Sequence, residues 1–569
     1  MAKTIDFPAF APDLSDLGQA TSLDITGVVP RGDGYGPFKD LQNFSAALPS
    51  ACRGYFFARR SDGSIAVFAG TQTELYLLDN ATFAWNVVSK ATYSPLVSTD
   101  NWRFAQFNDL VIAVQVNTVP QKYTLSAGGS FADLGGSPPS AGHIAVVGFF
   151  VMLTNLLSNP RRVQWSDLGA PQQWTAGVGL SDFQDLPDGG STLAVSGGDA
   201  YGLVFQEESI RSLTYAPGSA AIFQINRIST QETLFAQYSV INAGEKTFYC
   251  GAAGFKMVVA GGAPIAIGKE RVDRFFFGDV DRLNLQLVIG ASDPTATRVY
   301  WAYKSGTGGT ALFDKILCYD WSIGQHGEWS IIPMSGEFLA SLAKPGLTLE
   351  QLDALAPTPL NVLGAANNGA GLVRLTLNAT SNANFNIAGQ NFIVVQGVVG
   401  TTEANGSWRV NIIDATHIDL IGSSFANAYV SGGAIGGSLD ALTFSLDSVP
   451  KSFVAQLSAF NSAHKLGFFV GANIEATMET PEQDGEGQMI FTSGLRPITD
   501  CVASLCSIGW RNNPNAAIAY TTEAAIDDMG WAPQIIEARY QRGKLRCPAG
   551  ASWSYARGLQ PDSQAAGDR

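Results

Sequence analysis

The side chains that could perform chemistry are few in this chain and lie far apart. Its four histidines stand singly, and no two of them have the spacing of metal ligands: His143, His326, His417 and His464. The chain also lacks a Gly-x-Ser-x-Gly nucleophile motif, a Walker-type phosphate loop and a His-Glu-x-x-His zinc motif. The sequence therefore predicts no metal centre and no cofactor, and it favours a protein without enzymatic activity.

Paired carboxylates leave one catalytic alternative open. Glu207 and Glu208 are adjacent, as are Asp527 and Asp528, and neighbours on a strand point to opposite faces. The two carboxyl groups of a glycosidase are recognised by their separation in space, which spacing along the chain does not give. A sugar-cleaving site stays an alternative, although no residue pattern favours it.

The cysteines are scattered, a pattern that suits a reducing compartment. There are six of them: Cys52, Cys250, Cys318, Cys501, Cys506 and Cys547. Cys501 and Cys506 are five residues apart, which puts them on opposite faces of a strand. Buried thiols are therefore expected here rather than metal ligands.

An acidic segment in the last fifth of the chain is the first candidate site. It carries five carboxylates: Glu475, Glu479, Glu482, Asp484 and Glu486. Its simplest interpretation is a solvated loop. If it faced a DNA channel, its charges would repel phosphates within about one Debye length, roughly 8 Å at physiological salt. A channel-facing acidic loop is therefore a hypothesis for these residues.

The stretch VVPRGDGYGPF at 28–38 is the second candidate site. Its central residues are Arg31, Gly32, Asp33, Gly34, Tyr35, Gly36 and Pro37. The glycines permit positive φ and close backbone approach, and the proline fixes the exit of the chain. We expect a tight structural turn that holds an N-terminal arm against the first repeat or a neighbouring subunit, rather than a receptor-binding loop. Valine at positions 34 and 36 should then block folding or assembly.

Composition and charge limit the classes of function. The 569 residues have a net charge of −14 and a pI near 4.8, which opposes a surface built to neutralise nucleic-acid phosphates. An acidic surface still permits DNA to pass without binding. The start of the chain lacks an apolar run of signal-peptide length, and the most hydrophobic window, 144–157, is too short to cross a bilayer. We expect a soluble chain made in a cytoplasm, with no membrane insertion.

Repeated units between residues 51 and 335 predict the fold. Each unit has an apolar strand, a Gly, Asn or Asp turn, a second apolar strand, a polar stretch and often a closing aromatic residue. The six units centre on 65–79, 104–116, 143–167, 193–215, 247–268 and 298–332. A period of roughly 40–50 residues is typical of four-stranded propeller blades. The chain is predicted to be all-β, with a degenerate six-bladed propeller; an irregular array of β-sandwiches is the alternative.

The remaining segments complete the predicted domain order. We expect an extended N-terminal arm, a linker with a short helix, an inserted small β-barrel, a β-rich C-terminal region and a flexible tail. Their predicted ranges are 1–50, 336–371, 372–437, 438–557 and 558–569. The barrel is interpreted as an insertion because its flanks, 349–355 and 438–449, resemble each other.

Both ends of the chain resemble a known family. The start, DLSDLG…VVPRGDGYGPFKDL with ALPSACRGYFFARRSDGSIAVFAGTQTELYLLD, and the end, IEARYQRGKLRCPAGASWSYARGLQPD, are similar to tail proteins of short-tailed bacteriophages. These are the nozzle, or tail tubular protein B, and the related packaged-DNA-stabilisation proteins of the tail hub. Residues 400–433 resemble a β-module of phage structural proteins that is also likened to the FCCH domain of ubiquitin-activating enzymes. No ubiquitin chemistry is expected from that likeness.

The resemblance implies a virion structural protein. It implies a ring of six copies below the tail adaptor, which continues the channel for genome retention and ejection. Its partners would be further copies of itself, the adaptor, tail fibres or spikes, and double-stranded DNA that passes without specific binding. The alternative is a tail-tip propeller that binds or cleaves host surface carbohydrate; a secreted, adhesin-like propeller is a third.

Overall fold

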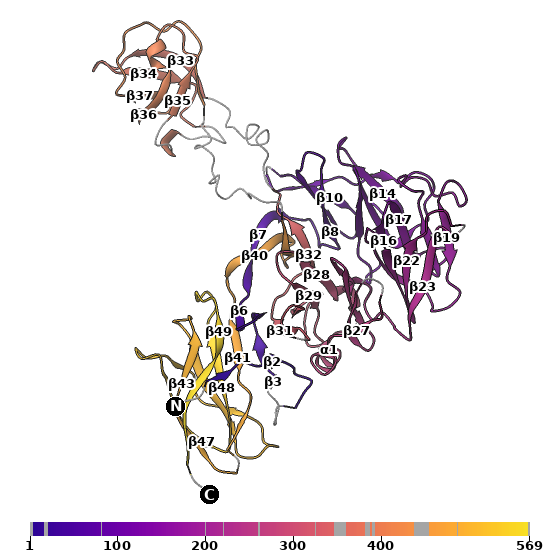
Figure 1. The fold of residues 1–569 in the computed structure, drawn as a ribbon. Coiled ribbons are helices and arrows are strands. Elements are labelled where there is room, and N and C mark those ends of the chain that lie inside the picture. The colour runs from indigo at the N-terminus through magenta and orange to yellow at the C-terminus, as the bar shows by residue number, and fades with distance from the viewer. Residues whose placement is uncertain are drawn as a thin grey trace. The chain divides into compact units, whose positions relative to one another are not determined.

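The computed structural model describes most of the chain, and strands dominate it (Figure 1). The described residues are 4–15, 21–80, 82–199, 201–219, 221–259, 262–324, 326–345, 360–381, 387–389, 393–436, 454–485 and 487–566. The chain forms two compact units, of which the second is Pro345–Phe453 with Asn80–Thr82 and the first is the remainder.

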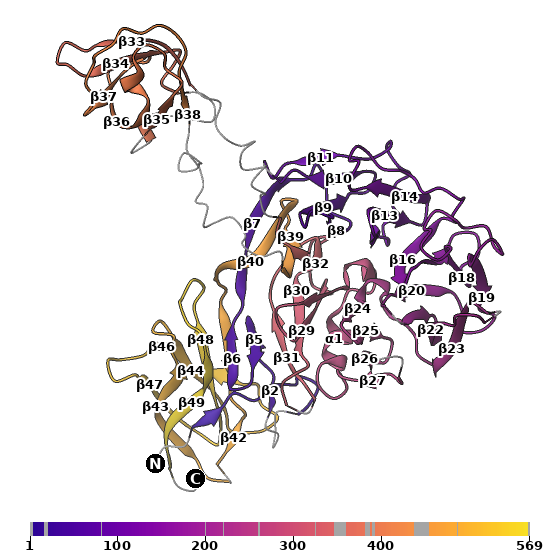
Figure 2. The same ribbon diagram turned by 45° about the horizontal axis from the view of Figure 1, so that its top comes forward.

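The first unit contains a β-propeller, whose ring of blades faces the viewer in Figure 2. Six antiparallel blades of four strands follow one another along the described chain, as the repeated units predicted, and the sixth blade is part of a larger sheet. Blade 1 is β8 (Tyr55–Arg59), β9 (Ile65–Gly70), β10 (Leu75–Leu78) and β11 (Trp85–Val87); blade 2 is β12 (Arg103–Phe107), β13 (Leu110–Gln115), β14 (Thr118–Thr124) and β15 (Ala132–Asp133); blade 3 is β16 (Ala141–Val147), β17 (Phe150–Leu156), β18 (Arg162–Trp165) and β19 (Asp182–Asp185).

The next three blades have the same construction. Blade 4 is β20 (Thr192–Ser196), β21 (Tyr201–Gln206), β22 (Ser209–Tyr215) and β23 (Phe223–Thr230); blade 5 is β24 (Ile241–Ala243), β25 (Lys246–Gly251), β26 (Gly254–Val259) and β27 (Ile265–Ala266); blade 6 is β28 (Ile289–Asp293), β29 (Arg298–Tyr303), β30 (Lys315–Asp320) and β31 (Glu328–Ile332). Their middle strands are packed on both faces by neighbouring blades, so they are continuous apolar runs: all six residues of β9 are buried.

A seventh blade corrects the predicted number of six. It combines β32 (Phe338–Ala343), β39 (Ala455–Phe460), β40 (Lys465–Asn473) and β7 (Lys39–Ala47), in that order. The Tyr55 hydroxyl of blade 1 donates to the Ser458 carbonyl of this blade at 2.7 Å and joins the two ends of the ring. No local repeat revealed the blade because its strands come from three distant parts of the chain. The first part of the predicted linker 336–371 is therefore a propeller strand.

The C-terminal region is a β-sandwich that the N-terminal arm completes. One sheet has the order β47 (Ala532–Ala538), β43 (Ile490–Thr499), β49 (Ala556–Ala565), β6 (Gly34–Pro37) and β5 (Val28–Arg31), and β1 (Ile5–Asp6) also pairs with β49. The other sheet contains β41 (Ala476–Glu479), β42 (Gln483–Asp484), β44 (Leu505–Arg511), β45 (Ala519–Tyr520), β46 (Ala524–Ala525) and β48 (Tyr540–Cys547).

The arm joins the propeller to this sandwich. Strand β4 (Ile25–Thr26) pairs in parallel with β31 of blade 6 and antiparallel with β41, so one sheet runs through both parts. A further parallel pair is β2 (Ala9–Phe10) with β3 (Thr21–Ser22). The arm is thus a set of strands in several sheets rather than a separate extended segment.

The predicted flexible tail 558–569 is wrong for most of its length. β49 runs to Ala565 and pairs with β43 from Ala556 to Ala565. Leu559 is 1% exposed and belongs to the sandwich core. The polar composition of this segment suggested a tail, but its backbone pairs with β43 although most of its side chains from residue 560 onward are half-buried or exposed.

The arm also caps the one α-helix among the described residues, α1 (Asp273–Asp279). The Asp13 carboxylate accepts hydrogen bonds from the backbone N–H groups of Arg274 and Phe275, both at 2.8 Å. These are donors that a first helical turn leaves unpaired. The first helical residue, Asp273, is buried at 8% exposure beside Phe255, whose N–H donates to it at 3.0 Å.

Asp273 should make stability depend on pH. Burial raises its carboxyl pKa from 3.8 to about 6, so between these values the folded chain holds a proton that the unfolded chain has released. Its contribution is therefore fully present below pH 3.8 and is lost as pH rises through about 6. Relative to Asp273→Asn, the wild type should lose about 3 kcal/mol of unfolding free energy across that window. Urea denaturation at several pH values measures the difference, and parallel pH profiles would contradict this assignment.

The second unit is a closed barrel. Its strands have the order β33 (Leu360–Asn367), β34 (Val373–Leu377), β37 (His417–Ile421), β36 (Gly406–Ile412), β35 (Ile393–Gln396) and β38 (Ala434–Gly436). Two short 3-10 turns, η3 (Ile387–Gly389) and η4 (Thr402–Ala404), lie in its loops. It has its own core, which includes Val373, Leu375, Ile418 and Leu420.

The barrel begins at 360 rather than 372, because β33 has the alternating burial of a strand. The predicted short helix of the linker and the two flanks, 349–355 and 438–449, lie outside the described residues.

The barrel enters the chain at a hairpin tip, which permits a test by excision. β32 and β39 pair from Phe338 with Phe460 to Ala343 with Ala455. Replacing residues 345–453 by Asn-Gly should therefore give an ordinary two-residue β-hairpin. We expect the melting temperature of the shortened chain to stay within about 4 °C of the wild type, equivalent to less than about 1 kcal/mol. Circular dichroism melts measure this, with the separate fragment 360–436 expected to unfold cooperatively. A much lower melting temperature for the shortened chain would show that the barrel stabilises the propeller.

Candidate functional site

The Arg-Gly-Asp stretch forms a tight hairpin at the junction of propeller and sandwich. β5 and β6 pair antiparallel, with Arg31 opposite Gly34, so Gly32 and Asp33 make the turn. The Arg31 guanidinium pairs with the Asp33 carboxylate at 3.1 Å and also donates to the Ser554 carbonyl at 2.8 Å. The two charged side chains of the motif therefore contact each other, and that of Arg31 also contacts the C-terminal part of the sandwich.

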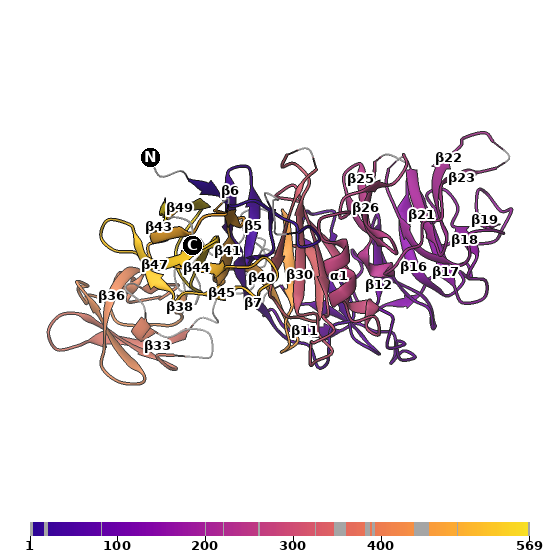
Figure 3. The same cartoon turned by 90° about the horizontal axis from the view of Figure 1, so that it is seen from below.

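The hairpin contacts the last strand of the chain and blade 6 rather than blade 1, as Figure 3 shows. On one side Tyr35 pairs with Ala556 of β49, and its buried hydroxyl donates to the Pro8 carbonyl at 2.8 Å. On the other side the Ser330 hydroxyl donates to the Val28 carbonyl at 2.7 Å. The turn thus connects parts of the chain that are hundreds of residues apart.

Positive φ is needed at one of the three glycines of the motif. Gly34 has φ +131°, and a Cβ there would lie 2.4 Å from the Ala556 carbonyl oxygen. A Cβ at Gly32 would meet no atom within 4 Å, and one at Gly36 would meet the flexible Arg31 side chain at 3.0 Å. The expectation of special geometry therefore holds for Gly34 alone.

The acidic segment is not a solvated loop along its whole length. Glu479 and Glu482 are buried, with side chains that are 3% exposed, whereas Glu475 is 55% exposed and pairs with Arg546. Asp484 is exposed on β42. Glu486 lies outside the described residues. A channel-facing role is thus wrong for the two buried carboxylates and stays a prediction for Glu475 and Asp484.

Cations surround the buried carboxylates in an ionic cluster, which we define as Glu479, Glu482, Arg511, Arg542 and Lys544. Glu482 accepts from Arg511 at 2.7 Å and from Arg542 at 3.0 Å. Glu479 lies 3.3 Å from the Lys544 ammonium. Burial, followed by the hydrogen bond to Glu479, raises the pKa of the Tyr520 hydroxyl, which donates to that carboxylate at 2.6 Å. The cluster joins β41, the residues that follow it, β44 and β48, so its evident role is to hold this sheet together.

The cations of this cluster were missed by sequence reasoning, although a signal was present. Arg542, Lys544 and Arg546 alternate along β48, which places them on one face of the strand. Three cations on one face predict a carboxylate-bearing neighbour. Only the fold identifies that neighbour as β41.

The other candidate residues are dispersed. All six cysteines are free and buried, and Cys501, Cys506 and Cys547 share one core. Among the described residues no group of three His, Cys, Asp or Glu side chains could hold a metal ion. In the same part of the chain, no helix is long and apolar enough to cross a membrane.

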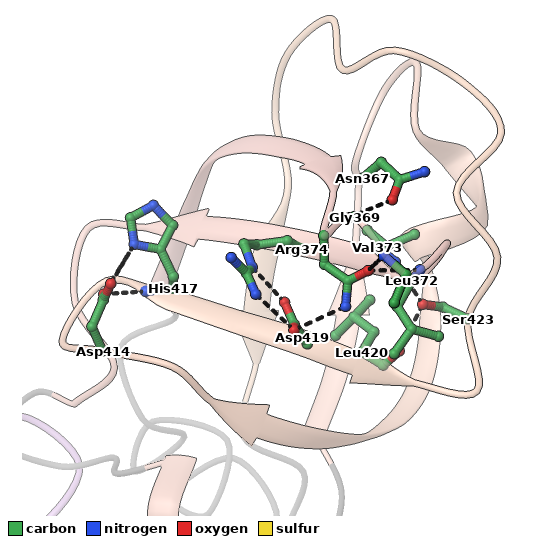
Figure 4. A network of polar contacts seen from close by, with 12 residues as sticks. Asn367, Gly369, Leu372, Val373, Arg374, Asp414, His417, Asp419, Leu420 and Ser423 are labelled. Carbon is green, nitrogen blue, oxygen red and sulfur yellow. Dashed lines mark hydrogen bonds and ion pairs between the residues drawn. The ribbon is translucent and has the colours of Figure 1, made fainter.

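The barrel carries a polar network of its own (Figure 4). Arg374 on β34 and Asp419 on β37 are cross-strand partners and form two hydrogen bonds, at 2.6 and 2.9 Å. The Arg374 hydrogen bond lowers the pKa of the Asp419 carboxyl. His417 contacts Asp414 at 2.9 Å in the preceding turn. Each of these side chains bonds to another barrel residue, as in a network that fixes strand register.

Comparison with known proteins yields only distant structural matches. No family model and no curated protein matches the chain. Solved structures do, among them BamB from Moraxella catarrhalis (12% identity, TM-score 0.31, 60% of this chain and 91% of that one). Others are the β-propeller domain of Cps50 (Swd1) from Myceliophteria thermophila (10%, 0.30, 43% and 79%) and the C-terminal WD40 domain of Sif2 (11%, 0.31, 66% and 96%).

Proposed function

We propose that this chain is a structural component of a bacteriophage tail, a nozzle or hub protein that assembles below the tail adaptor. The observation that supports this most is the meeting of the two chain ends. Of the segments whose sequences resemble the tail proteins, 28–38 and 536–562 meet in the sandwich, where β6 pairs with β49. The third such segment, 47–79, forms most of blade 1. The two ends of the chain that carry the resemblance therefore meet in one sheet.

In this proposal the genome channel runs between copies of the chain. The axial cavity of the propeller has a volume of about 370 Å³, which is the size of a small-molecule pocket and far too small for a duplex. A net charge of −14 suits a wall that conducts DNA without retaining it. The ionic cluster and the arm strands would give each copy the rigidity that a pressurised conduit needs.

Gold-labelled antibody against this chain, applied to intact particles and viewed by electron microscopy, tests the proposal. Label confined to the tail tube below the head is the expected result. Label on outward-projecting spikes would favour recognition of host carbohydrate instead, and binding or turnover on lipopolysaccharide and capsule would then follow as an assay. Particles without label would contradict a virion role.

A further inference from the structure

The propeller axis contains a cavity that the proposed function does not use. Residues from the inner strands of all seven described blades line its volume of about 370 Å³. Most lining side chains are apolar or aromatic, including Phe56, Phe104, Ile144 and Leu339. Arg103, on inner strand β12, is the one lining residue with a charged side chain in this set.

Hydrogen bonds link distant blades at the end of the ring where the inner strands begin. Two 3-10 turns, η1 (Gln237–Ser239) and η2 (Leu285–Leu287), precede the inner strands of blades 5 and 6. The Asn101 N–H donates to the Tyr238 hydroxyl at 2.8 Å, and the Asn101 side chain donates to the Gln286 carbonyl at 3.0 Å. Asn101 precedes blade 2, so these bonds join non-adjacent sides of the ring and cross its axis.

The Arg103 guanidinium has no anionic partner in the described part of the chain. It lies over the ring of Tyr238, with its Cζ 5.3 Å from the centroid, and burial lowers its pKa. The neighbouring arginine Arg53 differs, because it donates to the Asn101 side chain at 3.0 Å and to backbone carbonyls of residues 97–100. A buried charge is costly unless it is paired.

His143 does not supply the missing charge. Its ring is 1% exposed and stacks on Tyr238, with the centroids 5.5 Å apart. Burial, and then the proximity of Arg103, lowers the pKa of His143 to about 3. It is therefore neutral at pH 7, and the site holds a single positive charge.

We propose that the axial cavity binds a small organic monocarboxylate, with Arg103 as its anion-binding residue. A guanidinium matches a carboxylate through two parallel N–H···O bonds. One positive charge suits one negative charge, and the cavity volume suits a small organic molecule. The proposal is independent of the role in a phage tail, because it concerns one chain and its own axis.

Calorimetric titration of the purified full-length chain with benzoate and with benzamide tests the site. The two probes have nearly the same shape but differ in charge. We expect saturable binding of benzoate and binding of benzamide that is about tenfold to a hundredfold weaker, as for the loss of a charge-assisted hydrogen bond. Arg103→Met should weaken benzoate by a similar factor, whereas the exposed Arg161→Gln should leave it unchanged.

Other outcomes would overturn the inference. Benzoate that fails to bind the wild type up to about 10 mM, where the binding free energy is marginal, would show that Arg103 serves only to cover Tyr238. Equal affinity of the wild type for benzoate and benzamide would also show that Arg103 does not bind the carboxylate. This comparison needs no variant, so misfolding of Arg103→Met would not obscure the result. Inorganic phosphate that binds more tightly than benzoate would replace the carboxylate class with a general oxyanion.

Discussion

Valine in place of Gly34 should destroy the junction between propeller and sandwich. The residue adopts φ +131°, which side-chain-bearing residues adopt only under strain, and its Cβ would meet the Ala556 carbonyl oxygen at 2.4 Å and the Arg557 Cα at 3.0 Å. Both obstacles are backbone atoms of β49, so no rotamer change relieves them. We expect a loss of more than about 3 kcal/mol, a large part of the stability of a typical domain. Soluble yield and a thermal melt measure the effect.

The same motif provides matched controls. Gly32→Val lies two residues away in the turn, where a Cβ meets nothing within 4 Å, and it should change stability by less than about 1 kcal/mol. Gly36→Ala should be tolerated, because the Arg31 side chain can move. Equal effects of valine at 32 and 34 would mean that the hairpin does not pair with β49 as described.

Removal of the Glu482 carboxylate should be the second most damaging change. Its side chain is 3% exposed and accepts hydrogen bonds from Arg511 and Arg542, whose own side chains are 7% and 4% exposed. Glu482→Ala would leave two buried guanidinium groups without this counter-charge. Loss of one partner from a buried ion pair costs about 3–5 kcal/mol, which chemical denaturation would detect as a lower midpoint.

Glu475 is the matched control for this cluster. Its carboxylate belongs to the same acidic segment and pairs with Arg546 at 3.0 Å, but its side chain is 55% exposed. Exposed pairs contribute about 0–1 kcal/mol, so Glu475→Ala should be nearly silent. If the two alanine variants lost equal stability, the buried character of the cluster would be refuted. If Glu482→Ala were silent while Glu475→Ala changed particle assembly, the segment would regain its role as a channel wall.

Local patterns were enough to predict much of the fold. The six consecutive blades were predictable because each is a meander: strand, turn and strand follow in order, and apolar runs such as 65–70 mark strands buried on both faces. The barrel was interpreted as an insertion from the likeness of its flanks and not from a repeat, since its strand order, β33-β34-β37-β36-β35-β38, is not a meander. Its first strand was missed because LNVLGAAN, with a glycine and two asparagines, has little of the composition of a strand.

Pairing between strands that are distant along the chain could not be predicted from the sequence. β39 and β40 lie in a region predicted to be β-rich, but nothing local shows that they form one sheet with β7 and β32. A strand edge can pair with any other edge of suitable register, so the partner is selected by the geometry of the whole fold. The same holds for β4 between β31 and β41, which is only two residues long.

The two candidate sites show the same division. The sequence by itself determined that 28–38 needs unusual backbone geometry and that 475–486 is rich in carboxylates, because both follow from residue type. Tertiary structure alone decided that Gly34 is the constrained glycine and that Glu479 and Glu482 are buried among cations. The physical reason is that burial and charge pairing depend on which distant strands lie alongside, and Ala556, Arg511 and Arg542 are brought there by the sandwich.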